Sequence, residues 1–195
     1  MKKNRVMIRA ILVYSAYVLV LGLLQVTLPD PVSFGGCRPD LTLILAVLGG
    51  YMFGSADGFA VGLAAGLMRD LLAGRSLGLG MLLLMILAML ASVLFQQLFR
   101  RNIMLGLVQI IIFTVVYESL IMLITFLVPL QTGVTHSLAR LVGSMAGRLP
   151  AQLLVNVLAG FPLIFLLAFL GPYRRGSRSD DPDDAIVGDS IWRVS

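Results

Sequence analysis

Long apolar runs separated by short polar breaks set the organisation of this chain. The runs leave little polar sequence between residues 10 and 170, and they cover residues 10–28, 40–72, 77–99, 103–128 and 150–170. A helix needs about 20 apolar residues to cross the hydrocarbon core of a bilayer. The pattern therefore predicts an all-α, polytopic integral membrane protein.

The longest run, residues 40–72, is open to two interpretations. It could form one long tilted helix, or two short helices, 40–55 and 57–72, that turn near Ser55. Cytoplasmic loops of membrane proteins carry an excess of Lys and Arg. The hairpin puts ten basic residues on the cytoplasmic side and five outside, whereas the single helix gives eight and seven. We therefore expect six spans, a central short hairpin and both termini in the cytoplasm.

Composition excludes several other classes of protein. The chain is 58% hydrophobic and 13% charged, with a mean hydropathy of +0.96, which is too apolar for a soluble domain. One Cys and one His exclude a disulfide within the chain and a cysteine–histidine zinc site. The net charge is +5, but the basic residues are scattered over loops and form no patch, so we expect no nucleic-acid partner.

Three glycines recur every fourth residue in the second half of the 40–72 run. Gly58, Gly62 and Gly66 form a narrow groove on a helix, and Asp70 follows at its edge. In lipid, such a groove lets a neighbouring helix approach closely. Asp70 would then face a partner or the interface; the simpler interpretation is tight packing with an aspartate at a helix end.

A charged cluster is expected at the outer end of the hairpin. Asp40 and Asp70 each stand about 22 Å from the turn, given the rise of a helix. Asp40 follows Pro39, and this position is typical of a helix N-cap. We also expect Arg69 to pair with Asp40 across the hairpin, because adjacent Arg69 and Asp70 project in different directions.

The fifth predicted span, 103–128, carries the carboxylate of Glu118. An ionisable group within a span usually faces the bundle interior. Glu118 could contact a partner or lock helices together. Alternatively, it could form an interior hydrogen bond, for which Asn156 of the last span is a candidate.

The segment before the last span predicts a separate amphipathic helix over residues 134–149, lying on the outer membrane surface. Its polar stripe consists of His136, Arg140, Ser144 and Arg148. The stripe would meet either anionic headgroups or an extramembrane partner. Residues 1–178 would then form a single transmembrane domain, followed by a disordered acidic cytoplasmic tail at 179–195.

Motifs of known enzymes are not found in the sequence. It has no nucleophile elbow, P-loop or HExxH motif, and the glycine series lacks the strand-turn-helix context of a dinucleotide site. We therefore expect no catalytic residues, no cofactor and no metal site.

Two segments of the hairpin and its surroundings carry a family resemblance. PDLTLILAVL at 39–48 and GFAVGLAAGLMRDLLAGRSLG at 58–78 resemble the bacterial rod shape-determining MreD family. The resemblance implies a bacterial cytoplasmic-membrane protein with a six-helix fold similar to the substrate-binding subunits of energy-coupling-factor transporters. It also implies a non-enzymatic scaffold of the cell-elongation complex, which supports lateral peptidoglycan synthesis. The implied partners are MreC, MreB, and RodA with its penicillin-binding transpeptidase.

If the chain is such a scaffold, we expect the glycine groove to hold the two helices of the central hairpin together. The cluster of Asp40, Arg69 and Asp70, with Arg140 and Arg148, would then dock a single-span partner. The competing hypothesis is a small-molecule-binding subunit of a membrane transporter. An ion or proton channel has less support, because no row of ionisable residues crosses the bilayer.

Overall fold

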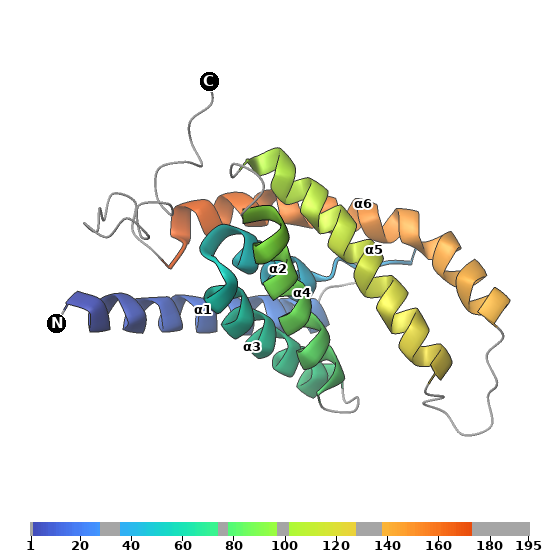
Figure 1. The fold of residues 1–195 in the computed structure, drawn as a ribbon, viewed down its shortest axis with the longest axis horizontal. Helices are drawn as coiled ribbons and strands as arrows, with labels where there is room; N and C mark the ends of the chain where they lie inside the picture. Colours follow the sequence, from blue (N-terminus) through green and yellow to red (C-terminus); the bar gives the residue numbers. More distant parts are fainter. Residues whose placement is uncertain (1, 28–35, 74–77, 97–101, 128–137, 173–195) are drawn as a thin grey trace.

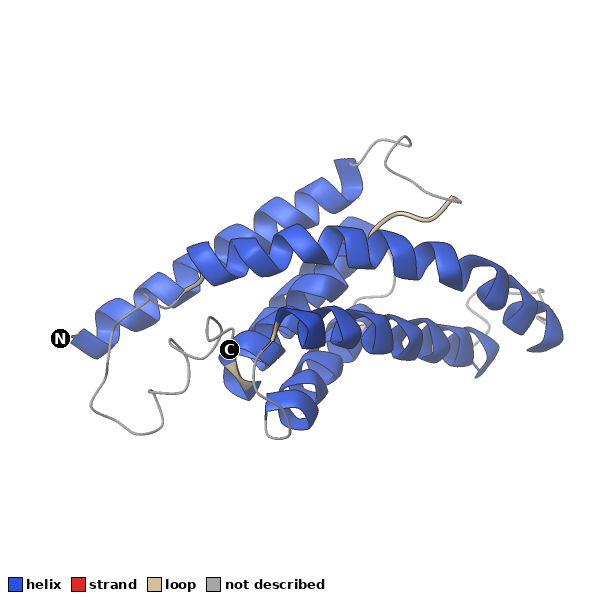
Figure 2. Cartoon of the chain, turned by 90° about the horizontal axis from the view of Figure 1, so that it is seen from above, coloured by secondary structure: helices blue, strands red, loops and turns tan. Residues whose placement is uncertain are grey.

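The computed structural model describes residues 2–27, 36–73, 78–96, 102–127 and 138–172, and all its regular elements are helices (Figures 1 and 2). They are α1 (Lys2–Thr27), α2 (Leu41–Phe53), α3 (Ser55–Ala73), α4 (Leu79–Gln96), α5 (Ile103–Leu127) and α6 (Leu138–Leu170). The predicted all-α fold is confirmed. His136 and the predicted tail at 179–195 lie outside the described residues.

Three of these helices are long and apolar enough to cross a membrane. They are α1 over Val6–Thr27, α5 over Ile103–Leu127 and α6 over Leu138–Leu170. Two shorter apolar helices, Leu41–Phe53 and Leu79–Leu94, accompany them. This set fits a multi-pass membrane protein, and the number of spans and the side of the termini stay predictions.

The long run 40–72 divides into α2 and α3, as the hairpin interpretation predicted. Gly54 separates them with φ 116°, a left-handed conformation that only glycine adopts readily. One long helix is therefore excluded. The two helices fold back on each other, which brings the start of α2 beside the end of α3.

Helix α2 forms the centre of the protein. Every residue from Leu41 to Met52 is buried, and the helix contacts each of the other five. A helix that is apolar all round is suited to the core of a protein or to lipid, and α2 lies in the core. Helices α3 and α4 pack most closely on it, α1 packs against α2 and α3, and α5 and α6 lie together beside this group (Figure 1).

The last helix differs from the prediction. The expected surface helix 134–149 and span 150–170 join in the described structure as one continuous helix from Leu138 to Leu170. Pro150 removes one backbone donor, yet no glycine-rich or polar loop interrupts the sequence around it. Prolines are tolerated inside spans where neighbouring groups compensate, so the amphipathic segment extends the last apolar helix.

Candidate functional site

The first candidate site is the start of α2, where a carboxylate caps the helix. Oδ1 of Asp40 accepts hydrogen bonds from the backbone N–H of Leu43 at 3.0 Å and from the hydroxyl of Thr42 at 2.8 Å. A capping aspartate satisfies donors that a helix start leaves without intrahelical partners. The predicted N-cap role of Asp40 is confirmed.

The other carboxylate oxygen of Asp40 binds the end of α3. Nη1 of Arg69 donates to Oδ2 of Asp40 at 2.6 Å, which confirms the pair predicted across the hairpin. The guanidinium carbon also lies 4.8 Å from the centre of the Tyr117 ring of α5. This geometry is a cation–π contact, so Arg69 connects α2, α3 and α5.

Side chains from α1 and α6 complete the capping of α2. Oε1 of Gln25 accepts from the Leu41 N–H at 2.7 Å, and Oδ1 of Asn156 accepts from the Asp40 N–H at 2.8 Å. The amide nitrogen of Asn156 donates to the Thr114 hydroxyl at 3.0 Å. Side chains from α1, α3, α5 and α6 therefore meet at the start of α2. Asn156 is fully buried there.

Sequence reasoning missed two members of this cluster, Gln25 and Gln152. Nε2 of Gln152 donates to the Arg38 carbonyl at 2.9 Å and to Oδ1 of Asn156 at 3.1 Å. The signal that could have found both is their position: each is an amide residue close to one end of an apolar run, and polar groups within a bundle need partners. Asn156, the candidate partner in the alternative interpretation of Glu118, instead bonds Thr114, Gln152 and the backbone of Asp40.

Asp70 caps the start of α4. It lies on α3, is 5% exposed, and its Oδ2 accepts from the Gly78 N–H at 2.9 Å and the Met81 N–H at 3.2 Å. A Cβ on Gly80 would collide with the Asp70 carboxylate, so a larger residue at this position would displace that side chain. The carboxylate is therefore directed into the protein, onto the positive end of a helix dipole.

The glycine groove of α3 is filled by α4. A Cβ on Gly62 would lie 2.7 Å from the Leu84 carbonyl oxygen, and one on Gly66 would meet the backbone of Met81. The close approach predicted for this groove is confirmed. The helix that mainly fills the groove is α4, not the hairpin partner α2. Helix α2 contacts the groove at Gly58, through its own Gly50. Sequence spacing identifies a groove and leaves its occupant open.

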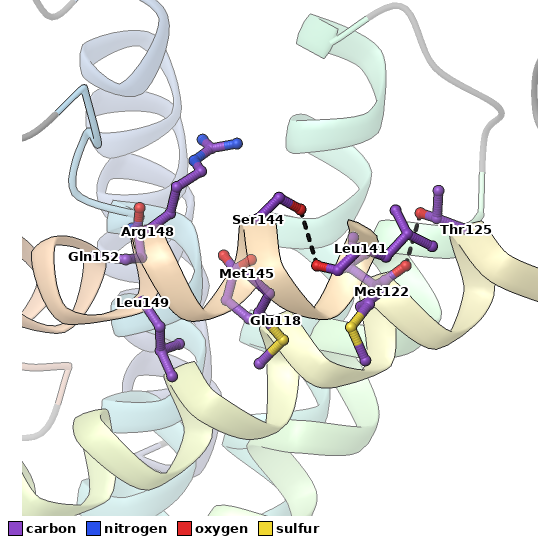
Figure 3. Close-up of a pocket in the computed structure, with 10 residues that line it drawn as sticks. Glu118, Met122, Thr125, Leu141, Ser144, Met145, Arg148, Leu149 and Gln152 are labelled. Atoms are coloured by element: carbon purple, nitrogen blue, oxygen red, sulfur yellow. Dashed lines mark hydrogen bonds between the residues drawn. The ribbon is translucent and has the colours of Figure 1, made fainter. Parts of the chain in front are cut away.

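The second candidate site is a cavity of about 130 Å³ between α5 and α6 (Figure 3). Half of its ten lining residues are apolar, and the polar half consists of Glu118 and Thr125 from α5 and Ser144, Arg148 and Gln152 from α6. Gln152 belongs to both sites, so the cavity adjoins the capping cluster of α2. Glu118 also lies within electrostatic range of Asp40, Arg69 and Arg148.

The first three turns of α6 form an exposed surface. Arg140 and Arg148 are both exposed, and in the part of the chain that the structure describes nothing lies within 4 Å of the Cβ position of Gly143 or Gly147. The structure thus separates the predicted site residues into two groups. Asp40, Arg69 and Asp70 hold helices together, whereas the two arginines of α6 lie at the surface.

The comparisons with known proteins identify one family. Its description is rod shape-determining protein MreD, and the match covers residues 5–170, from α1 through α6. Searches of curated proteins and of solved structures found no match. The matched segment contains the hairpin, the glycine groove and both candidate sites. The chain therefore belongs to the MreD family of rod shape-determining proteins, which are non-enzymatic multi-pass membrane proteins.

Proposed function

We propose that this protein is a membrane scaffold of the cell-elongation complex. In this role it supports lateral peptidoglycan synthesis by binding MreC and the synthase RodA with its penicillin-binding transpeptidase, and MreB directly or indirectly. Family membership implies a role in rod shape determination and an association with the elongation machinery. The individual partners, the six spans and the cytoplasmic location of both termini are parts of the proposal.

One observation carries the proposal: the three charged residues at the outer end of the hairpin are bonded inside the bundle. Asp40, Arg69 and Asp70 each hold the start of a helix or bind a group that does. A rigid bundle of this kind suits a protein that positions others. The residues that we assign to holding the platform are Asp40, Gly58, Gly62, Gly66, Arg69, Asp70 and Asn156.

For the docking of MreC, we assign the exposed start of α6. Arg148 stands about 33 Å from the Leu170 end at the rise of an α-helix. A hydrocarbon core is about 30 Å thick, so residues from Arg148 back to Leu138 reach the headgroups and beyond. A membrane-anchored partner with an acidic segment next to its span would complement Arg140 there.

The first test is complementation in a rod-shaped bacterium depleted of its own protein of this family. We expect wild-type chain to restore rods and to retain MreC and the synthase during purification in mild detergent. Arg140→Glu should lose MreC, whereas Arg140→Lys, which keeps the charge, should retain it. Rods without MreC retention by the wild-type chain would overturn the scaffold proposal. Equal retention by both variants would overturn the docking face.

The alternative, a small-molecule-binding subunit of a transporter, rests on the cavity beside Glu118. Sites for soluble ligands are commonly about 300–1,000 Å³ and bury most of the ligand. The cavity of about 130 Å³ is well below that range. The scaffold function therefore has the better support, and recovery of a bound soluble compound or an ATPase with the purified chain would favour the alternative.

A further inference from the structure

Two opposite charges, Glu118 and Arg148, line the cavity between α5 and α6 and lie within electrostatic range of each other. Glu118 and Arg148 both line it, and among the described residues neither side chain has a hydrogen bond or ion pair (Figure 3). An ionisable group at membrane depth is costly unless something neutralises or bonds it. The two groups therefore favour a ligand that carries both a positive and a negative charge.

The rest of the lining indicates where such a ligand comes from. Ile121, Met122, Leu141, Met145 and Leu149 supply apolar walls along the two helices. Around the cavity, both helices expose further large apolar side chains, at Leu123, Phe126, Leu127, Leu138 and Val142. The cavity thus lies between two candidate spans whose outer surfaces suit acyl chains.

The depth of the charges fits a lipid headgroup. Arg148 lies near the boundary of the hydrocarbon core when α6 spans from its Leu170 end. Glu118 lies about 22 Å from the Ile103 end of α5, roughly 8 Å short of a 30 Å boundary. An arginine at this level binds phosphate well, and a carboxylate below it can accept hydrogen bonds from an ammonium.

We propose that this cavity binds the headgroup of a phospholipid with a primary ammonium, such as phosphatidylethanolamine. The phosphate binds Arg148 and the ammonium donates to Glu118, while the acyl chains stay in the bilayer against the apolar wall. The small volume is then no obstacle, because the cavity holds only part of the lipid. A choline headgroup has no N–H to donate, and a glycerol headgroup has no positive charge, so both bind less tightly.

Native mass spectrometry of the full chain in detergent tests this directly. Equimolar phosphatidylethanolamine, phosphatidylcholine and phosphatidylglycerol with identical acyl chains are added, and the retained lipid is counted. We expect about tenfold preference for phosphatidylethanolamine, the effect of one or two hydrogen bonds to a charged group. Glu118→Gln should abolish the preference, and Arg148→Gln should lower the retention of all three lipids.

Arg140→Gln is the matched control, because it removes a charge from the same helix outside the cavity lining. It should leave lipid retention unchanged. Equal retention of the three lipids by wild-type chain, or a preference that survives Glu118→Gln, would overturn the proposal. If Glu118→Gln left lipid retention unchanged but lost MreC, the cavity would be a protein contact instead. No partner is present in the lipid experiment, so its outcome is independent of the scaffold function.

Discussion

Glycines at four-residue spacing occur on two helices of this protein, in opposite surroundings. On α3, a Cβ on Gly58 or Gly62 would lie 2.7 Å from a backbone atom of a neighbouring helix. On α6, a Cβ on Gly143 or Gly147 would have no described residue within 4 Å. The same spacing therefore closes a helix contact in one place and leaves an open surface in the other, and the neighbours decide which.

The charged residues follow the same division. In the group formed by α2, α3 and α4, Asp40 and Asp70 accept hydrogen bonds from helix starts, and Arg69 binds Asp40. Between α5 and α6, Glu118 and Arg148 line a cavity. The charged groups of the first set of helices are bonded within the bundle, whereas the side chains of Glu118 and Arg148 have no hydrogen bond or ion pair among the described residues. We therefore place structural roles in the first and interactions in the second.

The largest effect is expected from Gly62→Leu, which tests whether α4 is held by the glycine groove of α3. Its Cβ would lie 2.7 Å from the Leu84 carbonyl, and backbone cannot move aside without displacing α4. We expect a loss of more than about 3 kcal/mol of stability, at the upper end for overpacking. Cys37 is 1% exposed, so the rate at which a thiol dye labels it reports unfolding. Labelling as slow as in wild type would show that α4 is not held by this groove.

The next largest effect concerns the pair of Asp40 and Arg69. Asp40→Ala removes the N-cap and leaves the partly buried guanidinium without its carboxylate, so we expect a loss of about 3 kcal/mol. Asp40→Asn keeps an acceptor for the Leu43 N–H and should lose about half as much.

A charge swap of this pair separates the contribution of capping from that of charge pairing. Asp40→Arg with Arg69→Asp restores opposite charges, but arginine cannot accept from the Leu43 N–H. The double variant should therefore recover only part of the stability lost in the single variants. Full recovery, measured by thermal unfolding with the thiol dye, would show that capping contributes nothing.

Much of the hairpin could be predicted from the sequence, because its determinants are local. Pro39 before Asp40 and the glycine break near Gly54 act within a few residues. The pair of Arg69 with Asp40 followed from helix geometry once the turn was known. The occupant of the groove and the roles of Gln25 and Gln152 depend on how separate helices pack, and spacing along one chain does not contain that information.

A smaller effect is expected from Asp70→Asn. The amide still offers an oxygen to the N–H groups of Gly78 and Met81, but it loses the favourable interaction of a carboxylate with a helix start. We expect a loss of about 1 kcal/mol. Gly80→Ala should cost more, because its methyl group collides with the carboxylate, and combining it with Asp70→Ala should recover much of that loss. Simple additivity of the two changes would contradict the contact.

The smallest change, and one of opposite sign, is expected from Gly147→Ala. The added methyl group meets none of the described residues within 4 Å, and alanine is favoured over glycine inside a helix by about 1 kcal/mol. Thermal unfolding should therefore show unchanged or slightly raised stability, whereas the matched Gly62→Ala should lower it. If Gly147→Ala destabilised the isolated chain as Gly62→Ala does, the start of α6 would be packed against the protein itself. The division between a filled groove on α3 and an open one on α6 would then fail, and the docking surface assigned to α6 would fail with it.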